Sequence, residues 1–478
     1  MKLSRMGLLV AAIHSPLLLA ENITETSAAR VQQVLEAALL AHGGAERLDA
    51  IKTLRVEVVD SNIAVGQSRR AEPPLDRAQS RGQTAIDLSN SVFATRNAGV
   101  GGGYEFENGT VINADQSYQL DFNQGTRAKI AEPDFATTSG PFVRVSPTLL
   151  VLQLRDRAQN AYYLGQSVLD SKRFDVVGLS MAVGPGLSLY FDAQTHLLRR
   201  SERLLPGFGM VEYRFDDYQT VDGVPVNAKF TLLINGEESL LRTNLRTQIN
   251  ADLDDLVEPV KHLADIPPIV PQPLRLVKLT DKVFHVGGNG TYAMFIDQGD
   301  HYVAVGGTGG ISERLEMLRA EVGDKPVRYA AMTHHHSDHI LGVGAYEAAG
   351  ATIIGAKTHE QVIRAAAADA DALKFQPVEK LFTLGEGASR VEFVDVGPTA
   401  HVEHLILAWL PGPKILFEAD HFAMPAAGAV QAAATPTQEF AAALKRLQLA
   451  PKQIASAHSP RTGTMADLER ALELAKDD

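Results

Sequence analysis

A cluster of histidines at the end of an apolar run constrains this chain more than any other feature. The motif His-x-His-x-Asp-His begins at His334 and directly follows a run with the character of a buried strand. Side chains two residues apart on an extended segment point the same way, so His334 and His336 can bind one ion. Asp338 and His339 then turn off the strand towards a second ion. The alternative is a solvated histidine run without ligands.

Three further candidate ligands come at the ends of other predicted strands. The apolar run 391–396 leads through a turn to His401, which is expected to be the third nitrogen ligand of the first ion. An apolar hairpin then delivers Asp420 at the end of its second strand, where the carboxylate could bridge two ions. A short predicted strand after a helix ends at His458, which would complete the second site.

The remaining histidines need separate interpretations. His335 lies between two ligands and should point to the opposite side of the strand, in a packing or surface role. His404 is an alternative to His401, although the spacing to Trp409 favours His401. His421 either lines the cleft or only packs. Three others are expected to be solvated at loops and strand ends: His285, His301 and His359.

The order and spacing of these residues resemble the metallo-β-lactamase superfamily, from near Leu276 to the C-terminus. The resemblance implies two metal sites, one made by His334, His336 and His401 and the other by Asp338, His339 and His458, with Asp420 bridging them. This bridge is typical of the branch that contains glyoxalase II and many lactonases. Because the dizinc β-lactamases lack a bridging aspartate, penicillin cleavage is less favoured.

The chain departs from the family pattern near the end of another predicted strand. Gly307 stands where the family has an aspartate before Thr-Gly. That aspartate supports the ligands from outside, and such supports change metal affinity roughly ten- to a hundredfold. Weaker metal binding than in relatives is therefore expected. Three flanking positions also lack the usual glycine: Ala400, Ala457 and Ser459.

The ligand set predicts hydrolytic chemistry. A divalent ion held by three nitrogens keeps an open position and lowers the pKa of its water to roughly 7. We therefore expect an exported metal-dependent hydrolase in which a metal-bound hydroxide cleaves an ester, thioester, lactone or related acyl bond. Asp338 and Asp420 would be the catalytic carboxylates. The cofactor is expected to be two divalent ions, zinc first, with iron or manganese as alternatives.

Two other functions are compatible with the same residues. One is a ligand-binding or carrier protein with a structural or degenerate metal site. The other is an iron-dependent redox enzyme on the same ligands, since iron accepts the same donors. The expected partner of the leading hypothesis is a small-molecule acyl substrate, and the oligomeric state is left open.

Composition narrows the choice of partners and of architecture. A length of 478 residues exceeds one compact core, so two domains are expected. The net charge of -12 disfavours nucleic acid and anionic membrane surfaces, because both are bound by clusters of Lys and Arg. Residues 1–20 have the pattern of a cleaved secretory signal, which predicts a periplasmic or secreted protein. No later segment reaches the roughly 18 apolar residues of a membrane span.

The predicted fold class is α+β. Residues 21–257 should form an antiparallel β-rich domain with an N-terminal helix, residues 258–274 a Pro-rich linker, and residues 275–478 an αββα metallo-β-lactamase sandwich. Helices are expected at 340–349 and 360–372, among others. The stretch 190–226 weakly resembles the curved sheet of periplasmic lipoprotein carriers, which leaves open whether the first domain binds an apolar ligand or only packs.

Overall fold

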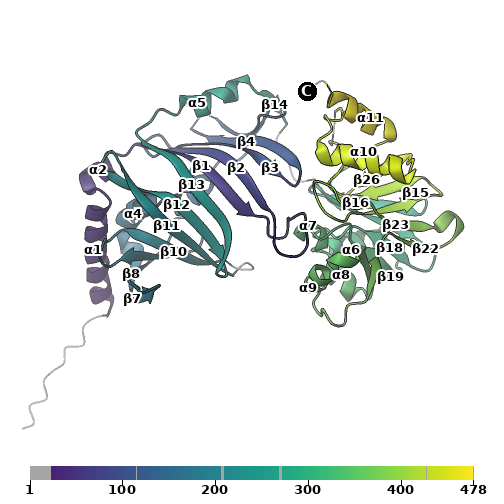
Figure 1. Cartoon of the computed structure of the whole chain (residues 1–478), viewed down its shortest axis with the longest axis horizontal. Coiled ribbons are helices and arrows are strands. Elements are labelled where there is room, and N and C mark those ends of the chain that lie inside the picture. Colours follow the sequence, from purple (N-terminus) through teal and green to yellow (C-terminus); the bar gives the residue numbers. More distant parts are fainter. Residues whose placement is uncertain (1–22, 115, 206–208, 268–271, 427, 477–478) are drawn as a thin grey trace, which may run out of the picture.

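A computed structural model describes residues 23–476 apart from 115, 206–208, 268–271 and 427. The expected signal segment 1–20 lies outside these residues. Two β-rich parts lie side by side, the N-terminal part in purple and teal and the C-terminal part in green and yellow (Figure 1). None of the helices within the described residues is long and apolar enough to cross a membrane.

One continuous sheet of 14 strands forms the N-terminal part. Its strands are β1 (Thr53–Ile63), β2 (Arg77–Asp87), β3 (Val92–Gly101), β4 (Tyr104–Ile112), β5 (Ser117–Asp121), β6 (Thr126–Lys129), β7 (Ala161–Leu169), β8 (Lys172–Leu179), β9 (Leu187–Asp192), β10 (Leu198–Leu205), β11 (Gly209–Val221), β12 (Val224–Ile234), β13 (Glu237–Ile249) and β14 (Ala264–Ile266). Their order is β14-β6-β5-β4-β3-β2-β1-β13-β12-β11-β10-β9-β8-β7, so two antiparallel meanders, β1 to β6 and β7 to β13, join where β1 pairs with β13.

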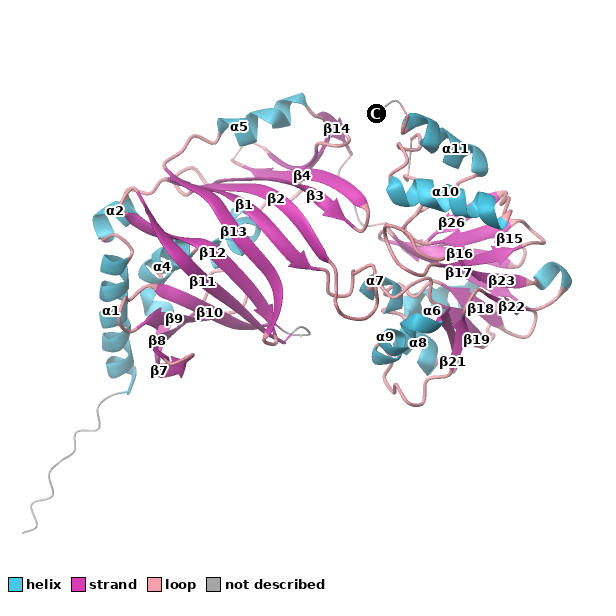
Figure 2. Cartoon of the chain, in the orientation of Figure 1, coloured by secondary structure: helices cyan, strands magenta, loops and turns pink. Residues whose placement is uncertain are grey.

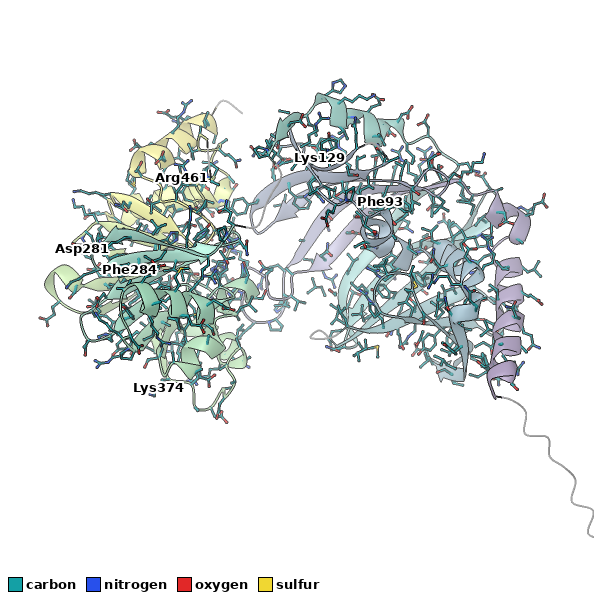
Figure 3. The ribbon with its side chains drawn as sticks, turned by 180° about the vertical axis from the view of Figure 1, so that it is seen from behind. Phe93, Lys129, Asp281, Phe284, Lys374 and Arg461 are labelled. Atoms are coloured by element: carbon teal, nitrogen blue, oxygen red, sulfur yellow. The ribbon has the colours of Figure 1, made fainter. Side chains whose placement is uncertain are left out.

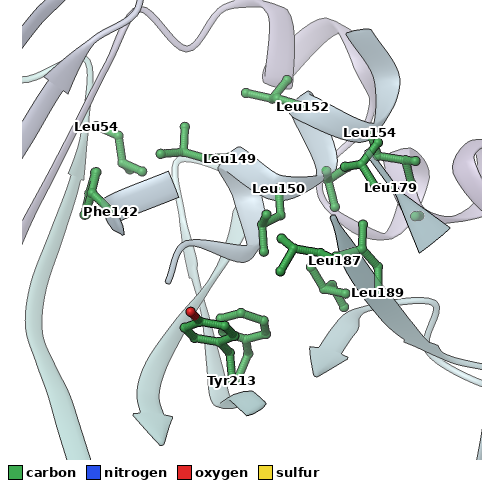
Figure 4. Close-up of a cluster of buried hydrophobic side chains, with 14 of the residues drawn as sticks. Leu54, Phe142, Leu149, Leu150, Leu152, Leu154, Leu179, Leu187, Leu189 and Tyr213 are labelled. Atoms are coloured by element: carbon green, nitrogen blue, oxygen red, sulfur yellow. The ribbon is translucent and has the colours of Figure 1, made fainter. Parts of the chain in front are cut away.

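Helices pack on this sheet and bury its core. They are α1 (Ile23–Ala41), α2 (Ala45–Asp49), α3 (Phe135–Arg144), α4 (Pro147–Asp156) and α5 (Asp254–Val257). Ser146 caps α4 and proline occupies its first turn, two features that start a helix. Most of α4 is apolar and buried, and Leu149, Leu150 and Leu154 pack in the cluster of Figure 4. A helix that is apolar all round belongs in a core.

The stretch expected as a linker is partly built into this sheet. Residues 258–262 form a short 3-10 helix, and β14 pairs in parallel with β6. The prolines between 267 and 273 follow this strand rather than precede it. The chain therefore leaves the N-terminal sheet later than the Pro-rich pattern indicates.

Two smaller sheets form the C-terminal part. The first has seven strands in chain order: β15 (Arg275–Thr280), β16 (Val283–Gly288), β17 (Thr291–Asp297), β18 (Tyr302–Val305), β19 (Val327–Ala331), β20 (Thr352–Ala356) and β21 (Phe375–Val378). The second has five strands: β22 (Leu381–Leu384), β23 (Val391–Asp395), β24 (Ile406–Leu410), β25 (Ile415–Glu418) and β26 (Gln453–Ser456).

The two smaller sheets pack face to face with helices outside, so the expected αββα sandwich is confirmed (Figure 2). Inner side chains such as Met294, Phe393 and Phe417 share one core. The helices are α6 (Ile311–Glu321), α7 (Ser337–Ile340), α8 (Val343–Ala348), α9 (Glu360–Ala365), α10 (Thr435–Leu447) and α11 (Met465–Leu474). A second core, which includes Phe284, joins α6, α8 and α9 to the seven-stranded sheet, and a third joins α10 and α11 to the five-stranded sheet (Figure 3).

Two predicted helices are shorter than expected. The segment 340–349 is divided into α7 and α8 at Gly342, whose backbone N–H donates to the carbonyl of Gly307 at 2.7 Å. A Cβ on Gly342 would lie 2.9 Å from the carbonyl oxygen of Thr308, so the close approach of two loops interrupts the helix. The segment 360–372 is helical only as far as Ala365.

Candidate metal centre

Four strands end at one edge of the sandwich, and the predicted ligands follow them. The histidine motif comes after β19, His401 after β23, Asp420 after β25 and His458 after β26. The structure brings all seven side chains together in two groups, and within each group the potential ligand atoms lie within 4.8 Å of one another. The groups are His334, His336, His401 and Asp420, and Asp338, His339 and His458.

The first group can hold a cation. His334 Nε2 and His401 Nε2 lie 3.1 and 3.2 Å from Asp420 Oδ2. His334 Nε2 and His336 Nδ1 are buried and have no aligned hydrogen-bond partner among the described residues. Buried polar atoms are normally satisfied, so lone pairs that converge beside a carboxylate fit a metal ion.

The second group uses the same aspartate. His339 Nε2 lies 2.8 Å from Asp420 Oδ2, and His458 Nε2 lies 3.0 Å from Asp420 Oδ1. Asp338 Oδ2 lies 3.3 Å from His339 Nε2 and 3.6 Å from His458 Nε2. Asp420 thus stands between the two groups, where a bridging carboxylate must lie. Its backbone has a φ of 62°, in the left-handed region.

The carboxylates and imidazoles of the centre shift one another's pKa values. Burial opposes ionisation of Asp420, but the neighbouring histidines, His339 first, hold the pKa of this carboxyl well below its usual range. Burial also opposes protonation of His339 and His458, yet the two carboxylates outweigh it and raise their pKa values to about 9 and about 10. The site therefore attracts positive charge at neutral pH.

Backbone carbonyls set the tautomers of three candidate ligands. His336 Nε2 lies 3.0 Å from the oxygen of Ser68, His401 Nδ1 2.9 Å from that of Gly102, and His458 Nδ1 3.1 Å from that of Gly290. A carbonyl only accepts, so the facing ring nitrogen carries the hydrogen and the other nitrogen is left for a metal. Sequence reasoning missed Ser68 and Gly102, although the glycine run that ends at Gly103 signals a close backbone approach.

The position of Gly307 leaves no space for the family's aspartate. A Cβ there would lie 2.3 Å from Met332 Sδ and 2.4 Å from the carbonyl oxygen of His339. The buried Thr308 Oγ1 and His339 Nδ1 have no hydrogen-bond partner in the part of the chain that the structure describes. With glycine at position 307, no side chain there can support His339 Nδ1.

The other histidines of the motif region lie outside both groups of potential ligands. His335 packs within the fold, with Nε2 at 2.9 Å from the oxygen of Ser68, which His336 also contacts, and Nδ1 at 3.2 Å from His359 Nε2. His404 Nδ1 lies 2.7 Å from Asp395 Oδ2, outside both groups. The buried His421 packs behind the site, with Nε2 at 3.1 Å from Thr399 Oγ1.

Two predictions of solvated histidines were wrong. His285 and His359 are each 1% exposed. His285 stacks on Tyr292 and bonds the carbonyl of Ser456 at 3.1 Å, and burial lowers its pKa to about 4. His285 packs against the ring of Tyr292 and His359 against the ring of His335, and a local sequence pattern does not predict such contacts. His301 is partly exposed and pairs with Asp300.

Two cavities reach the metal centre. One, of about 700 Å³, is lined by Asp420 together with Tyr104 and Glu105 of the N-terminal sheet. The other, of about 650 Å³, is lined by His458 and by apolar side chains that include Met424 and Pro425. Ala423 and Gln431 line both cavities, so the loop after Asp420 separates them.

Comparison with known proteins finds relatives of the C-terminal part. The family model described as "Metallo-beta-lactamase superfamily" matches residues 286–475. Similar solved structures include metallo-beta-lactamases from Pontibacter korlensis (19% identity, 43% of this chain and 100% of that chain, TM-score 0.36), Hirschia baltica (19%, 43% and 98%, 0.33) and, in a mono-zinc form, Pseudomonas aeruginosa (18%, 43% and 96%, 0.34). No curated protein matches the chain. From residue 286 to residue 475, the chain belongs to the metallo-beta-lactamase superfamily.

Proposed function

We propose that this chain is a metal-dependent hydrolase of an ester, thioester, lactone or related acyl bond. The observation that carries the proposal is the placement of Asp420 between two groups of nitrogen and oxygen donors from four strand ends. Seven such side chains at one edge of a superfamily fold are the ligand set of a two-ion site.

The proposed cofactor is two divalent ions, and we propose zinc. Bound ions would supply a water of lowered pKa and would polarise the scissile carbonyl. Imidazole and carboxylate donors suit zinc, and they also accept iron or manganese. Elemental analysis of the purified protein identifies the metal and separates hydrolytic from iron-dependent redox chemistry.

The carboxylates have distinct roles in this proposal. Asp420 fixes the spacing of the two groups because each of its oxygens faces imidazoles of the site. Asp338 is held by Gln67 Nε2, which donates to its Oδ1 at 2.8 Å, while Oδ2 faces His339 and His458. Its pKa lies below the usual range, so it is ionised at neutral pH; it could take the proton of the attacking hydroxide during collapse of the intermediate and return that proton to the leaving group.

One of the two cavities has polar walls and the other apolar walls, which fits an acyl substrate with one polar and one apolar end. The apolar cavity beside His458 can take the hydrocarbon of the acyl group, because Met424 and Pro425 line it. The cavity beside Asp420 has polar walls, including Glu105 and Gln438, and can take a hydrated leaving group. The scissile bond would then lie at the metal centre.

The structure gives less support to a carrier function. Between α3, α4 and the N-terminal sheet there is a cavity of about 20 Å³, lined by Leu54 and Phe142 among others. That volume accommodates about one water molecule, far below the several hundred Å³ of a typical ligand site. The core between these helices and the sheet therefore gives no room to an apolar ligand, and the larger hollows of the N-terminal part, of about 470 and 380 Å³, lie elsewhere on the sheet.

A hydrolysis screen on zinc-loaded protein tests the proposal. Lactones, thioesters, β-lactams and phosphodiesters should be compared, with His262→Ala as an exposed, distant control for Asp420→Ala. Turnover of an acyl substrate that chelation abolishes and zinc restores supports the proposal. Full turnover by metal-free protein contradicts it.

We also propose export, on the signal-like pattern of residues 1–20. Cell fractionation followed by N-terminal sequencing tests this. A mature protein that keeps Met1 and stays in the cytoplasmic fraction contradicts it.

A further inference from the structure

We infer that the N-terminal sheet completes the metal centre, because two of its loops hold ligands that belong to the C-terminal sandwich. The loops are the β1–β2 loop (residues 64–76) and the β3–β4 turn (residues 102–103). Figure 1 shows the first of them reaching α7. The inference rests on the proposed function and adds the positioning residues of the site.

The β1–β2 loop fixes the orientation of His336. The carbonyl of Ser68 accepts from His336 Nε2 at 3.0 Å and from His335 Nε2 at 2.9 Å. His336 is thereby left with a free Nδ1, while the first group's other two histidines offer Nε2. A rigid acceptor at this point is needed because the ring could otherwise present either nitrogen.

The same loop is itself rigid and fastened. Asp76 accepts from Ser68 Oγ and from the backbone N–H of Arg69, both at 2.9 Å. Two backbone hydrogen bonds join the loop to the C-terminal sandwich. Ser337 N donates to the carbonyl of Gly66 at 2.8 Å, and Glu403 N donates to that of Arg69 at 2.8 Å. These backbone hydrogen bonds fix the position of the loop beside the histidine motif, and they do not depend on side-chain rotamers.

The β3–β4 turn holds His401 and Asp420. The carbonyl of Gly102 accepts from His401 Nδ1 at 2.9 Å, and the ring of Tyr104 makes a T-shaped contact with the same imidazole. The Tyr104 hydroxyl donates to the backbone carbonyl of Asp420, the residue with a left-handed backbone. Only glycine fits at 102, because a Cβ would lie 2.8 Å from His401 Nδ1.

These contacts give the first ion group outer support of the kind that the Gly307 side of the site lacks. The side of the site that faces Gly307 leaves His339 Nδ1 without a partner within the described ranges. The N-terminal loops instead hold His336, His401 and Asp420, three members of the first ion group. Outer supports of this kind govern metal affinity roughly ten- to a hundredfold.

The test is Gly102→Ala in the full chain, with Gly125→Ala as its matched control. Both glycines have a left-handed backbone, with φ of 58° and 63°, so both substitutions carry similar strain. A Cβ at Gly125 meets nothing within 4 Å, whereas one at Gly102 displaces His401. We expect Gly102→Ala to weaken zinc binding at the first site by roughly ten- to a hundredfold in chelator competition. Gly125→Ala should match the unmodified chain.

Tyr104→Phe provides a milder variant that keeps the ring. Loss of one hydrogen bond to the Asp420 carbonyl should weaken zinc binding by roughly three- to tenfold. Cobalt substitution gives a second measurement, because the cobalt absorption bands report ligand geometry directly and a general loss of stability does not shift them. Shifted bands in Gly102→Ala and unshifted bands in Gly125→Ala are expected.

The outcomes separate the inference from the proposed function. If the unmodified chain binds two ions and hydrolyses an acyl substrate, but Gly102→Ala and Tyr104→Phe both bind zinc with unchanged affinity and unchanged cobalt spectra, the inference alone is wrong. If the unmodified chain binds no metal, the proposed function fails as well.

Discussion

Replacing Gly307 by alanine should destabilise the C-terminal sandwich. The added Cβ would lie 2.3 Å from Met332 Sδ and 2.4 Å from the carbonyl oxygen of His339, against an ordinary contact of 3.4 Å or more. Both neighbours must therefore move by about 1 Å, and the second is backbone that carries a candidate ligand. Overpacking of this kind costs about 1–3 kcal/mol, and the backbone clash places Gly307→Ala at the upper end.

The assay is denaturant unfolding followed by tryptophan fluorescence. Trp409 is the chain's single tryptophan and is 8% exposed in the five-stranded sheet, so it reports on the sandwich. Gly309→Ala is the matched control, because a Cβ there would lie 3.6 Å from its nearest neighbour, an ordinary contact. Equal midpoints for Gly307→Ala and Gly309→Ala would refute the reasoning about steric space.

Three further predictions concern protonation and the ligands. Burial lowers the pKa of His42 from 6.5 to about 4. Between pH 6.5 and pH 4 the folded state therefore binds fewer protons than the unfolded state. The free energy of unfolding falls by about 3 kcal/mol as the pH drops through this range. His42→Gln should lose correspondingly less stability between pH 7 and pH 4 in denaturant titrations followed by circular dichroism, and an unchanged pH slope would contradict this. His401→Ala should lose the first ion while His404→Ala retains two, as measured by elemental analysis, because His404 is bound to an aspartate outside both groups; equal metal content in both variants would show that the two histidines were assigned wrongly. Asp420→Asn should lower turnover at least a hundredfold with a loss of bound metal, and near-normal kcat and metal content would argue against a bridging carboxylate.

The candidate site could be predicted because its residues carry a local signature. The spacing of His334, His336, Asp338 and His339 after an apolar run is recognisable without any tertiary information. The later ligands follow other predicted strands, whose ends were expected to lie at one edge of the sheets. The structure brings these ligands together with the histidine motif. Donor type and position along the chain were sufficient for this part.

The remaining features depend on contacts between distant segments. A backbone carbonyl such as that of Ser68 has no residue-type signature, so its role towards His336 could not be read from the sequence. The burial of His359 depends on His335, from a different strand end. The break at Gly342 depends on Gly307 and its neighbours. In each case the cause is a tertiary approach that local periodicity does not encode.

The pairing of β1 with β13 has a consequence for the order in which the molecule matures. Leu54 of β1 pairs with Ile249 of β13, so one edge of β1 stays open until synthesis has passed residue 249. Pairing over such a separation is slow, and an open strand edge invites association with other chains. The histidine motif is made later still, so the N-terminal loops that contact the candidate ligands are synthesised before the ligands themselves.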